Sequence, residues 1–309
     1  MQVSVIGMGA IGGMIAARLQ MSGAHTEIVV KPSNCLYKKR TLTLHEKNKK
    51  SVVEFEHVLT DISKLTGEVV FICTKSTANK LLFPQLSSLK NKTFVIVQNG
   101  IGEEERLAED LGDSNSIYGG ATRIKVTKCD DNVTVHNDLN DFIYGPLGSK
   151  KAVNKKLSDI LALIFTDVQL CPNLFQARFP KLVISAAMNG LNVLYNKDLY
   201  ILSLDNSFKD KVLLLEKEVL RIAQAYKVDI KPFMAEVILP KLSLPHYKGV
   251  NLSMQDDYLA GKKMELESIY GNLLQLASSK NIDVPELSAL YQKLNLLEGN
   301  ETVYERGNA

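Results

Sequence analysis

The sequence lacks the features that mark several specialised classes of protein. It contains no tryptophan, and its four cysteines, at positions 35, 73, 129 and 171, never form a C-x-x-C pair. This spacing indicates neither a zinc site nor a thioredoxin-like redox motif, so we expect reduced thiols and no metal. Long hydrophobic runs are missing too: no stretch reaches roughly 18 uninterrupted apolar residues, and no charged segment with a cleavage site opens the chain. These absences predict a cytoplasmic protein with no membrane partner.

An excess of charge of one sign is also missing. The 37 Lys and Arg residues against 34 Asp and Glu residues leave a formal net charge of +3. A dedicated nucleic-acid-binding protein normally concentrates its basic residues on one face, so we expect no nucleic-acid partner. The 309 residues, 45% of them apolar, are enough for two globular domains of about 150 residues each.

The first half of the chain alternates short β-branched runs with amphipathic stretches. Helices are expected over residues 12–21 and 150–165, and strands over 2–6, 26–30, 68–73, 93–97, 117–127, 132–144 and 167–170. Strands that alternate with helices predict right-handed crossovers and a mostly parallel, doubly wound α/β sheet with helices on both faces. The two runs joined by the polar turn 128–131 predict an antiparallel edge on that sheet.

The hydrophobic period changes to 3.6 residues after Cys171. Helices are expected over residues 174–201, 205–227, 231–242, 252–279 and 285–298. The sequence therefore predicts a Rossmann-type α/β domain over residues 1–172 and an all-helical domain over residues 173–309. The helical domain offers a surface for a homodimer, although no heptad repeat specifies one.

A glycine-rich loop joins the first predicted strand to the first helix. It has the spacing G-x-G-x-x-G and consists of Gly7, Met8, Gly9, Ala10, Ile11 and Gly12. The first glycine permits a tight turn, the second lets a pyrophosphate approach the backbone, and the third lets helix and strand pack closely. The helix N-terminus adds free N–H groups and the positive end of its dipole. The loop predicts a dinucleotide site, and the alternative is a glycine turn with a purely structural role.

The residue after the second predicted strand bears on which dinucleotide binds. An NAD-binding chain usually has Asp or Glu here for the ribose hydroxyls, whereas this chain has Lys31, which can meet a 2′-phosphate. Glu27 lies too early in the strand to replace that acidic residue. We therefore expect NADP (NADPH) rather than NAD. The alternative is that Lys31 is a solvated lysine at a strand end.

Two further loops follow predicted strands, at the edge where open parallel sheets bind ligands. Lys75 could reach a cofactor phosphate or ribose, and Asn99 could hydrogen-bond the nicotinamide ribose or a substrate oxygen. Each is equally compatible with simple turn chemistry, since Asn99-Gly100 is a strong turn dipeptide.

The most informative segment runs from residue 180 to residue 196. On a helix its polar side chains fall within an arc of roughly 80° on an otherwise almost entirely apolar surface. This polar stripe consists of Lys181, Ser185, Asn189, Asn192 and Asn196. A helix of this kind is buried, and its stripe must face something polar. Either the stripe meets solvent and neighbouring helices, or it lines a cleft between the domains, where the burial of its one lysine suits proton transfer near neutral pH.

A second polar set lies on the helix expected over residues 252–279. The residues that share one face there are Glu265, Ser268, Asn272 and Gln275. Ser253 is expected to be the N-cap of that helix or a substrate contact. For Glu265 a solvated position is as good an interpretation as a functional one. None of the five histidines falls in these segments, and no Ser-His-Asp or metal-ligand spacing is present, so we expect no histidine-based catalysis.

Together these residues resemble the ketopantoate reductase (2-dehydropantoate 2-reductase) family over essentially the whole chain. Each motif alone is common, whereas the ordered set is specific. The set comprises the glycines at 7, 9 and 12, Lys31, Lys75, Asn99-Gly100, Lys181-Leu182, the run Ser253, Met254, Asp257, Gly261, Glu265 and Gly271, and Tyr304 to Arg306.

The resemblance implies an NADPH-dependent reductase whose cleft lies between a Rossmann domain and a helical domain like that of 6-phosphogluconate dehydrogenase. Its small-molecule substrate would be the 2-oxo acid 2-dehydropantoate, reduced to (R)-pantoate on the route to coenzyme A. The resemblance implies that Lys181 is the general acid and that Glu265 binds substrate hydroxyl groups and orients Lys181. The other implied substrate contacts are Asn99, Ser185, Asn189 and Ser253. This agrees with the chemistry, because hydride addition builds negative charge on the ketone oxygen, which an ammonium stabilises and then neutralises.

The chain departs from the family pattern at four positions. Ser185 stands where the family has Asn, Gly190 where it has Pro, Met264 where it has Thr, and Tyr270 where it has Asn. These differences leave the cofactor expectation intact and keep two alternatives open. One is a sister reductase of another 2-oxo acid, and the other is a regulator that senses NADPH without turnover.

Overall fold

The computed structural model describes residues 1–148 and 154–306, with side chains up to residue 299. The chain forms two compact units: residues 1–98 with 103–178, and residues 99–102 with 179 to the C-terminus. The short loop 99–102 thus belongs to the helical unit. No helix in the described ranges is both long and apolar enough to cross a membrane. In the same ranges no three His, Cys, Asp or Glu side chains are grouped as a metal site requires.

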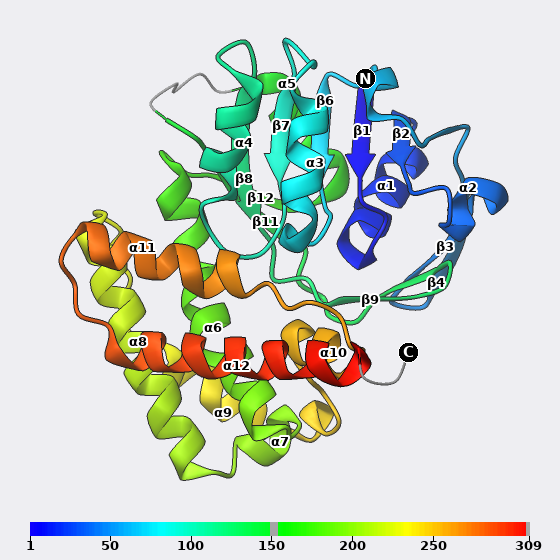
Figure 1. Ribbon diagram of the computed structural model, residues 1–309. Coiled ribbons are helices and arrows are strands. Elements are labelled where there is room, and N and C mark those ends of the chain that lie inside the picture. Colours follow the sequence, from blue (N-terminus) through cyan, green and yellow to red (C-terminus); the bar gives the residue numbers. More distant parts are fainter. Residues whose placement is uncertain (149–153, 307–309) are drawn as a thin grey trace. The chain divides into compact units, whose positions relative to one another are not determined.

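An eight-stranded sheet forms the centre of the first unit (Figure 1). Its strand order is β12-β11-β8-β7-β6-β1-β2-β5, and every neighbouring pair is parallel except β8 with β11. The strands are β1 (Gln2–Ile6), β2 (His25–Val29), β5 (His57–Leu59), β6 (Val69–Ile72), β7 (Thr93–Ile96), β8 (Ser116–Ala121), β11 (Asp141–Pro146) and β12 (Asp167–Leu170). This confirms the doubly wound, Rossmann-type sheet.

Helices cover both faces of this sheet. One hydrophobic core packs the strands against α1 (Ala10–Met21) and α5 (Lys155–Ile164), and a second core packs them against α3 (Asn79–Leu86) and α4 (Glu103–Leu111). Strands that are buried on both faces are continuous apolar runs, which is why β1, β6 and β7 could be located from sequence. The short 3-10 helices are η1 (Ile62–Lys64) and η2 (Ser76–Ala78).

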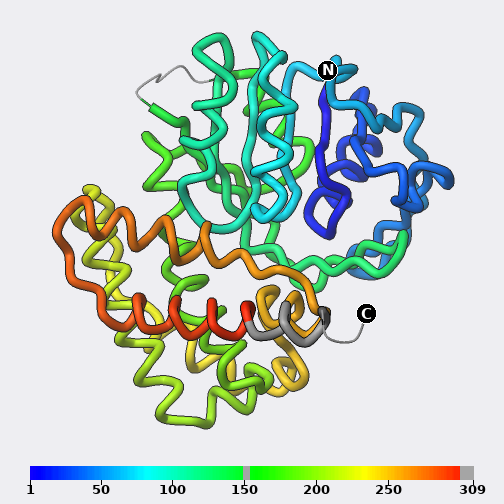
Figure 2. The backbone as a smooth tube through the Cα atoms, viewed as in Figure 1, coloured from blue at the N-terminus to red at the C-terminus, as the bar shows by residue number. Residues whose placement is uncertain are grey.

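A second sheet, of order β4-β3-β10-β9, was not predicted from the sequence. Its strands are β3 (Thr41–Glu46), β4 (Lys49–Glu54), β9 (Val126–Cys129) and β10 (Asn132–Val135), and the short helix α2 (Cys35–Lys39) precedes β3. In Figure 2 the β9–β10 hairpin lies beside the much earlier segment of β3 and β4. Leu42, Leu44 and Val133 of this sheet are buried in the core that contains α1.

The two long strands expected over residues 117–127 and 132–144 are each divided between the sheets, so the predicted continuous strands were wrong. β8 and β11 pair antiparallel in the main sheet, inside the edge strand β12, while β9 and β10 belong to the second sheet. Between them, Asp141 accepts a hydrogen bond from the Arg123 N–H (3.1 Å), and the Thr122 hydroxyl accepts one from the Ile124 N–H (3.1 Å). Such side-chain bonds compete with the strand ladder and end it.

Helices make up the second unit, as expected. They are α6 (Leu174–Tyr195), α7 (Leu199–Leu202), α8 (Asn206–Ala225), the π-helix η3 (Met234–Ile238), α9 (Leu239–Leu242), the 3-10 helix η4 (Pro245–Tyr247), α10 (Ser253–Leu259), the π-helix η5 (Glu267–Gly271), α11 (Asn272–Ser279) and α12 (Pro285–Arg306). The helix expected over 174–201 breaks at Asn196 (φ +49°), and that over 252–279 breaks at Gly261 (φ +62°), because a positive φ ends a helix. The side chains of Tyr304 to Arg306, and the first residues of the helix expected over 150–165, lie outside the described residues.

Arg178 ties the first turns of α6 to the sheet within the first unit. Its guanidinium is 3% exposed and forms an ion pair with the fully buried Glu104. It also donates to the backbone carbonyls of Ile96 (2.9 Å), Gln98 (2.7 Å) and Gly120 (2.7 Å), near the carboxyl ends of β7 and β8. A planar cation with five donors can serve several acceptors at once.

We expect Arg178→Met to lower the free energy of unfolding by about 3–5 kcal/mol, because it leaves the Glu104 charge buried and unpaired. Denaturant unfolding followed by circular dichroism measures this. The control is Lys211→Met, which removes an exposed ion pair with Glu286 (2.7 Å) and should cost no more than about 1 kcal/mol. Equal losses for the two variants would contradict the anchoring role of Arg178.

Candidate active site

The glycine loop has the geometry that a dinucleotide site requires. Gly7 has φ +94°, and a Cβ there would lie 2.6 Å from the Thr74 nitrogen. A Cβ on Gly12 would lie 1.9 Å from the Gly7 carbonyl oxygen, so α1 can pack this closely only without a side chain. A Cβ on Gly9, by contrast, would meet no described atom within 4 Å. This side of the loop is therefore open to a ligand.

The first turn of α1 completes the loop. No side chain of the described residues caps this turn, so the N–H groups around Ala10 and Ile11 are left for an anion. The Met8 side chain is buried in the core, while its carbonyl accepts a hydrogen bond from the Lys128 ammonium. The loop thus fits a pyrophosphate, held by its main chain rather than by its side chains.

Lys31 is exposed just beyond the end of β2, whereas Glu27 within that strand is buried. The Glu27 carboxylate accepts hydrogen bonds from the Ser4 hydroxyl (2.6 Å), from the Gly67 N–H (3.0 Å) and from Thr66. Burial raises the pKa of Glu27, but these hydrogen bonds outweigh it and hold the pKa below its ordinary value. The Glu27 carboxylate is therefore occupied by interior hydrogen bonds, which agrees with the expectation that Glu27 does not replace the acidic residue at the strand end.

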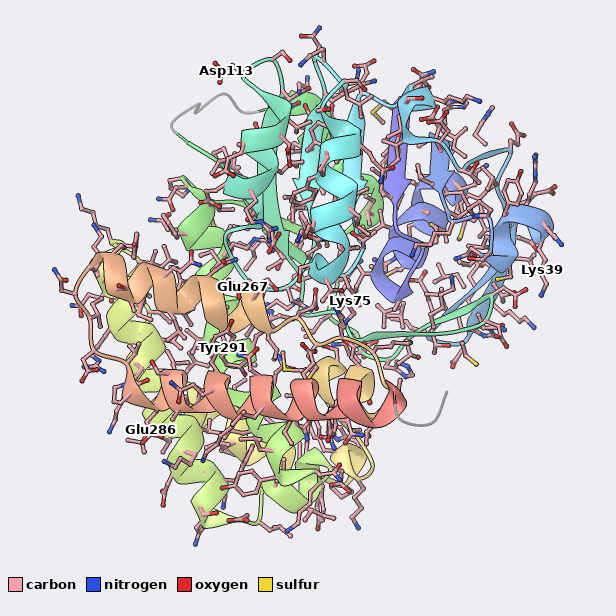
Figure 3. The ribbon with its side chains drawn as sticks, in the orientation of Figure 1. Lys39, Lys75, Asp113, Glu267, Glu286 and Tyr291 are labelled. Carbon is pink, nitrogen blue, oxygen red and sulfur yellow. The ribbon has the colours of Figure 1, made fainter. Side chains whose placement is uncertain are left out.

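Lys75 is exposed at the N-cap of η2 (Figure 3). A buried network of side-chain amides, which was not predicted from the sequence, joins the segment after β6 to the segment after β7. Gln98 donates to the Thr74 hydroxyl (2.9 Å) and to Asn79 Oδ1 (2.7 Å), and Asn79 Nδ2 donates to Gln98 (2.8 Å) and Glu103 (2.7 Å). The sequence did contain a signal for this network, because a polar residue, Thr74 or Gln98, directly follows each of the two predicted apolar strands.

Asn99 and Glu265 meet within the helical unit, although they are 166 positions apart. Asn99 Nδ2 donates to Glu265 Oε2 at 3.2 Å, and Glu265 is 4% exposed. The loop that carries Asn99 is fixed by two further bonds: the Ile101 N–H donates to the Ser268 carbonyl (2.9 Å), and Asn272 Nδ2 donates to the Ile101 carbonyl (2.6 Å). A carboxylate and an amide from distant segments thus form one polar site.

Two glycines make this packing possible. Gly100 and Gly102 have φ +91° and +92°, and a Cβ on Gly100 would lie 2.1 Å from the Ser268 carbonyl oxygen. A Cβ on Gly102 would lie 2.6 Å from Asn272 Nδ2. The Asn99-Gly100 pair is therefore more than a turn signal, because both the backbone conformation and the close approach require glycine.

Three expectations for residues 252–279 change. Glu265 immediately precedes the first helical residue, Leu266, rather than lying within a helix. Gln275 is exposed, so it does not share the role of Ser268 and Asn272 in holding the loop 99–102. Ser253 is the exposed first residue of α10, and Leu252 occupies the N-cap without a side-chain bond, so the N-cap interpretation of Ser253 was wrong.

The polar stripe of α6 divides into two halves. In the C-terminal half, Asn192 accepts from the Leu252 N–H (2.8 Å) and donates to the Lys197 carbonyl (2.8 Å), and Asn196 accepts from Gln255 (3.0 Å). These amides hold neighbouring segments of the helical unit, which is the structural alternative left open by the sequence.

The N-terminal half of the stripe consists of Lys181, Ser185 and Asn189. Lys181 is half-buried, and Ser185 and Asn189 are only 7% and 8% exposed. Within the described residues, neither the Ser185 hydroxyl nor the Asn189 side-chain amide forms a hydrogen bond with the protein. Among the described residues the fully buried side-chain atoms without a partner are Glu104 Oε2 and Gln255 Oε1, so the polar atoms of Ser185 and Asn189 reach solvent and are available to a ligand.

Two of the four departures from the family pattern contact each other. The buried Tyr270 hydroxyl accepts a hydrogen bond from the Gly190 N–H at 2.7 Å, and a Cβ on Gly190 would lie 2.7 Å from the same oxygen. A proline at 190 would have no N–H to donate, so Gly190 and Tyr270 form a matched pair in the packing. Met264 is buried (3% exposed), and Ser185 is the departure that lies on the N-terminal half of the stripe.

Comparisons with known proteins cover both units. The family model "Ketopantoate reductase PanE/ApbA" matches residues 3–149, and "Ketopantoate reductase PanE/ApbA C terminal" matches residues 173–298. The 2-dehydropantoate 2-reductase of Nostoc sp. is 28% identical over 306 residues, which span 96% of this chain and 95% of the relative.

Solved structures share the fold over nearly the full length. The 2-dehydropantoate 2-reductase of Methylococcus capsulatus has a TM-score of 0.81 at 24% identity, with 97% of this chain and 98% of that chain covered. D-mandelate dehydrogenase in its ternary structure with NADH and anilino(oxo)acetate has a TM-score of 0.84 at 18% identity, with 98% and 100% covered. Because the two family models together account for most of the sequence, the chain belongs to the ketopantoate reductase family of oxidoreductases.

Proposed function

We propose that this chain reduces 2-dehydropantoate to (R)-pantoate with NADPH. The observation that carries the proposal is the pair of buried polar side chains, Ser185 and Asn189, that have no hydrogen-bond partner among the described residues and share a helix face with Lys181. Their polar atoms are not among the fully buried unpaired ones, so they reach solvent, and a ligand can replace that solvent as the hydrogen-bond partner. The membership of the chain in the ketopantoate reductase family supports a 2-oxo acid as that ligand.

The cofactor part of the proposal rests on the first unit. The open side of Gly9 and the uncapped first turn of α1 suit a pyrophosphate, and Lys31 suits a 2′-phosphate. Lys75 and Asn99 follow β6 and β7 and complete the proposed cofactor contacts. NADPH, when bound, supplies the hydride for the C2 carbonyl.

The remaining chemistry is carried out by side chains of the helical unit. The Lys181 ammonium stabilises the negative charge that develops on the ketone oxygen and donates a proton to it, and the neutral amine then recovers a proton from solvent. Glu265 is held in place by Asn99 and accepts hydrogen bonds from substrate hydroxyl groups. Ser185, Asn189 and Ser253 orient the substrate, so that the carbonyl meets the proton donor in a reactive geometry.

One observation favours a second candidate, a sister reductase of a different 2-oxo acid. Ser185 is the family departure on the substrate side of the stripe, and it is shorter than the Asn of the family pattern. A shorter side chain leaves room for, and loses one contact with, a different substrate. The Gly190–Tyr270 pair does not bear on this choice, because these residues satisfy each other.

Lys181→Ala should lower kcat by about 10²- to 10⁴-fold, because it removes the general acid, while the Kd for NADPH changes little. Steady-state kinetics and a fluorescence titration measure the two quantities separately. The control is Lys241→Ala, which removes an exposed lysine of α9. Full turnover by the Lys181 variant would exclude this residue from proton transfer.

Lys31→Asp should shift the ratio of kcat/KM for NADPH over NADH toward NADH by about 10- to 100-fold, since it replaces an attractive charge at the 2′-phosphate by a repulsive one. Both cofactors are compared at constant ionic strength. Lys38→Asp, on the exposed part of α2, makes the same charge change nearby. An unchanged ratio in the Lys31 variant would mean that this side chain does not contact the 2′-phosphate.

A panel of 2-oxo acids, assayed by the loss of NADPH absorbance, tests the substrate. We expect 2-dehydropantoate to have the highest kcat/KM, because its hydroxyl group can bind Glu265. A higher value for another 2-oxo acid would establish the sister reductase instead. Saturable binding of NADPH with no turnover of any member would indicate a sensing protein.

A further inference from the structure

Lys128 reaches the glycine loop from the second sheet. It lies on β9, and its ammonium donates a hydrogen bond to the carbonyl oxygen of Met8. Lys128 is half-buried, although most lysines of this chain are exposed. This hydrogen bond connects a cation of the second sheet to the glycine loop.

The packing of the second sheet on α1 explains this position. A Cβ on Gly13 would lie 2.9 Å from Val133 and 3.2 Å from Leu42, so the sheet approaches α1 closely at a residue without a side chain. Side chains alternate along β9, where Thr127 and Cys129 are exposed and Lys128 is turned inward. The strand that packs on α1 thus carries its lysine directly to the start of that helix.

The charge of Lys128 is not neutralised by an ion pair within the described residues. The acidic group that affects its pKa, Asp131, forms an ion pair with Lys39 (labelled in Figure 3) at 2.9 Å. Burial lowers the pKa of Lys128, and the proximity of Cys35 and Asp131 only partly opposes this. An ammonium has three donors, and one of them is used for the Met8 carbonyl. Two donors and a net positive charge remain for an anion.

We propose that Lys128 binds the 2′-phosphate on the adenosine ribose of NADPH, together with Lys31. This rests on the proposed cofactor. The Lys128 ammonium lies against the glycine loop, since it contacts the Met8 carbonyl. In a Rossmann fold, the adenosine ribose lies at the end of the second strand of the unit, beside the glycine loop. The second sheet, which the doubly wound core does not require, thus supplies a specificity-determining residue for the cofactor.

The experiment compares two ligands that differ only in the phosphate, 2′-phospho-ADP-ribose and ADP-ribose, by isothermal titration calorimetry. Lys128→Met should weaken binding of the phosphorylated ligand by about 10- to 100-fold, as expected for a lost charge-assisted contact, and leave ADP-ribose binding within about twofold. Lys49→Met is the matched control, because it removes an exposed lysine from the same sheet. It should change neither affinity.

Three results would overturn the assignment: unchanged binding of 2′-phospho-ADP-ribose, an equal loss for both ligands, or a wild-type protein that binds both equally well. An equal loss would mean that Lys128 supports the loop or the pyrophosphate instead. If the Met variant does not fold, Lys128→Gln replaces it, because Gln keeps a donor for the Met8 carbonyl and removes the charge. Failure of the wild type to bind either ligand would refute the proposed function, which is a distinct outcome.

Discussion

Close approach between backbones, possible only where a side chain is missing, is the constraint on which both candidate sites depend. A Cβ on Gly12 would lie 1.9 Å from the Gly7 carbonyl oxygen, and one on Gly100 would lie 2.1 Å from the Ser268 carbonyl oxygen. The approach of Gly12 to Gly7 fixes the turn before α1. The approach of Gly100 to Ser268 holds the loop after β7 against η5. In each case the candidate groups, backbone N–H groups in one unit and the Asn99–Glu265 pair in the other, are positioned by glycines.

The buried polar side chains differ in how many hydrogen-bond partners they have within the protein. Glu27 and Arg178 are buried, and each is surrounded by several hydrogen-bond partners of its own unit. Asn192 on the polar stripe is also paired at both ends of its amide. Ser185 and Asn189 occupy the same helix face but have no such partners among the described residues. This difference marks the half of the stripe that a ligand is expected to use, because its polar atoms still reach solvent.

The residues that depart from the family pattern differ in whether their contacts lie within the protein. Gly190 and Tyr270 are 80 positions apart in sequence, and the Gly190 N–H donates a hydrogen bond to the Tyr270 hydroxyl, so one substitution accommodates the other. Their contact therefore gives no reason to expect a different substrate. Ser185 is the departure on the half of the stripe whose polar atoms form no hydrogen bond within the described residues.

The sequence by itself determined the features that depend on short-range patterns: the glycine loop with its strand–turn–helix context, the parallel strands that are apolar on both faces, the change to helical periodicity after Cys171, and the burial of the helix that carries Lys181. Only the tertiary structure decided which polar residues pair with one another. The Asn99–Glu265 contact, the division of the α6 stripe, the Arg178 anchor and the approach of Lys128 to Met8 each join segments through space. The second sheet was missed for the same reason. Its strand β3 pairs with β10, in which Thr43 faces Asn132, and local periodicity carries no information about a partner so distant in the sequence.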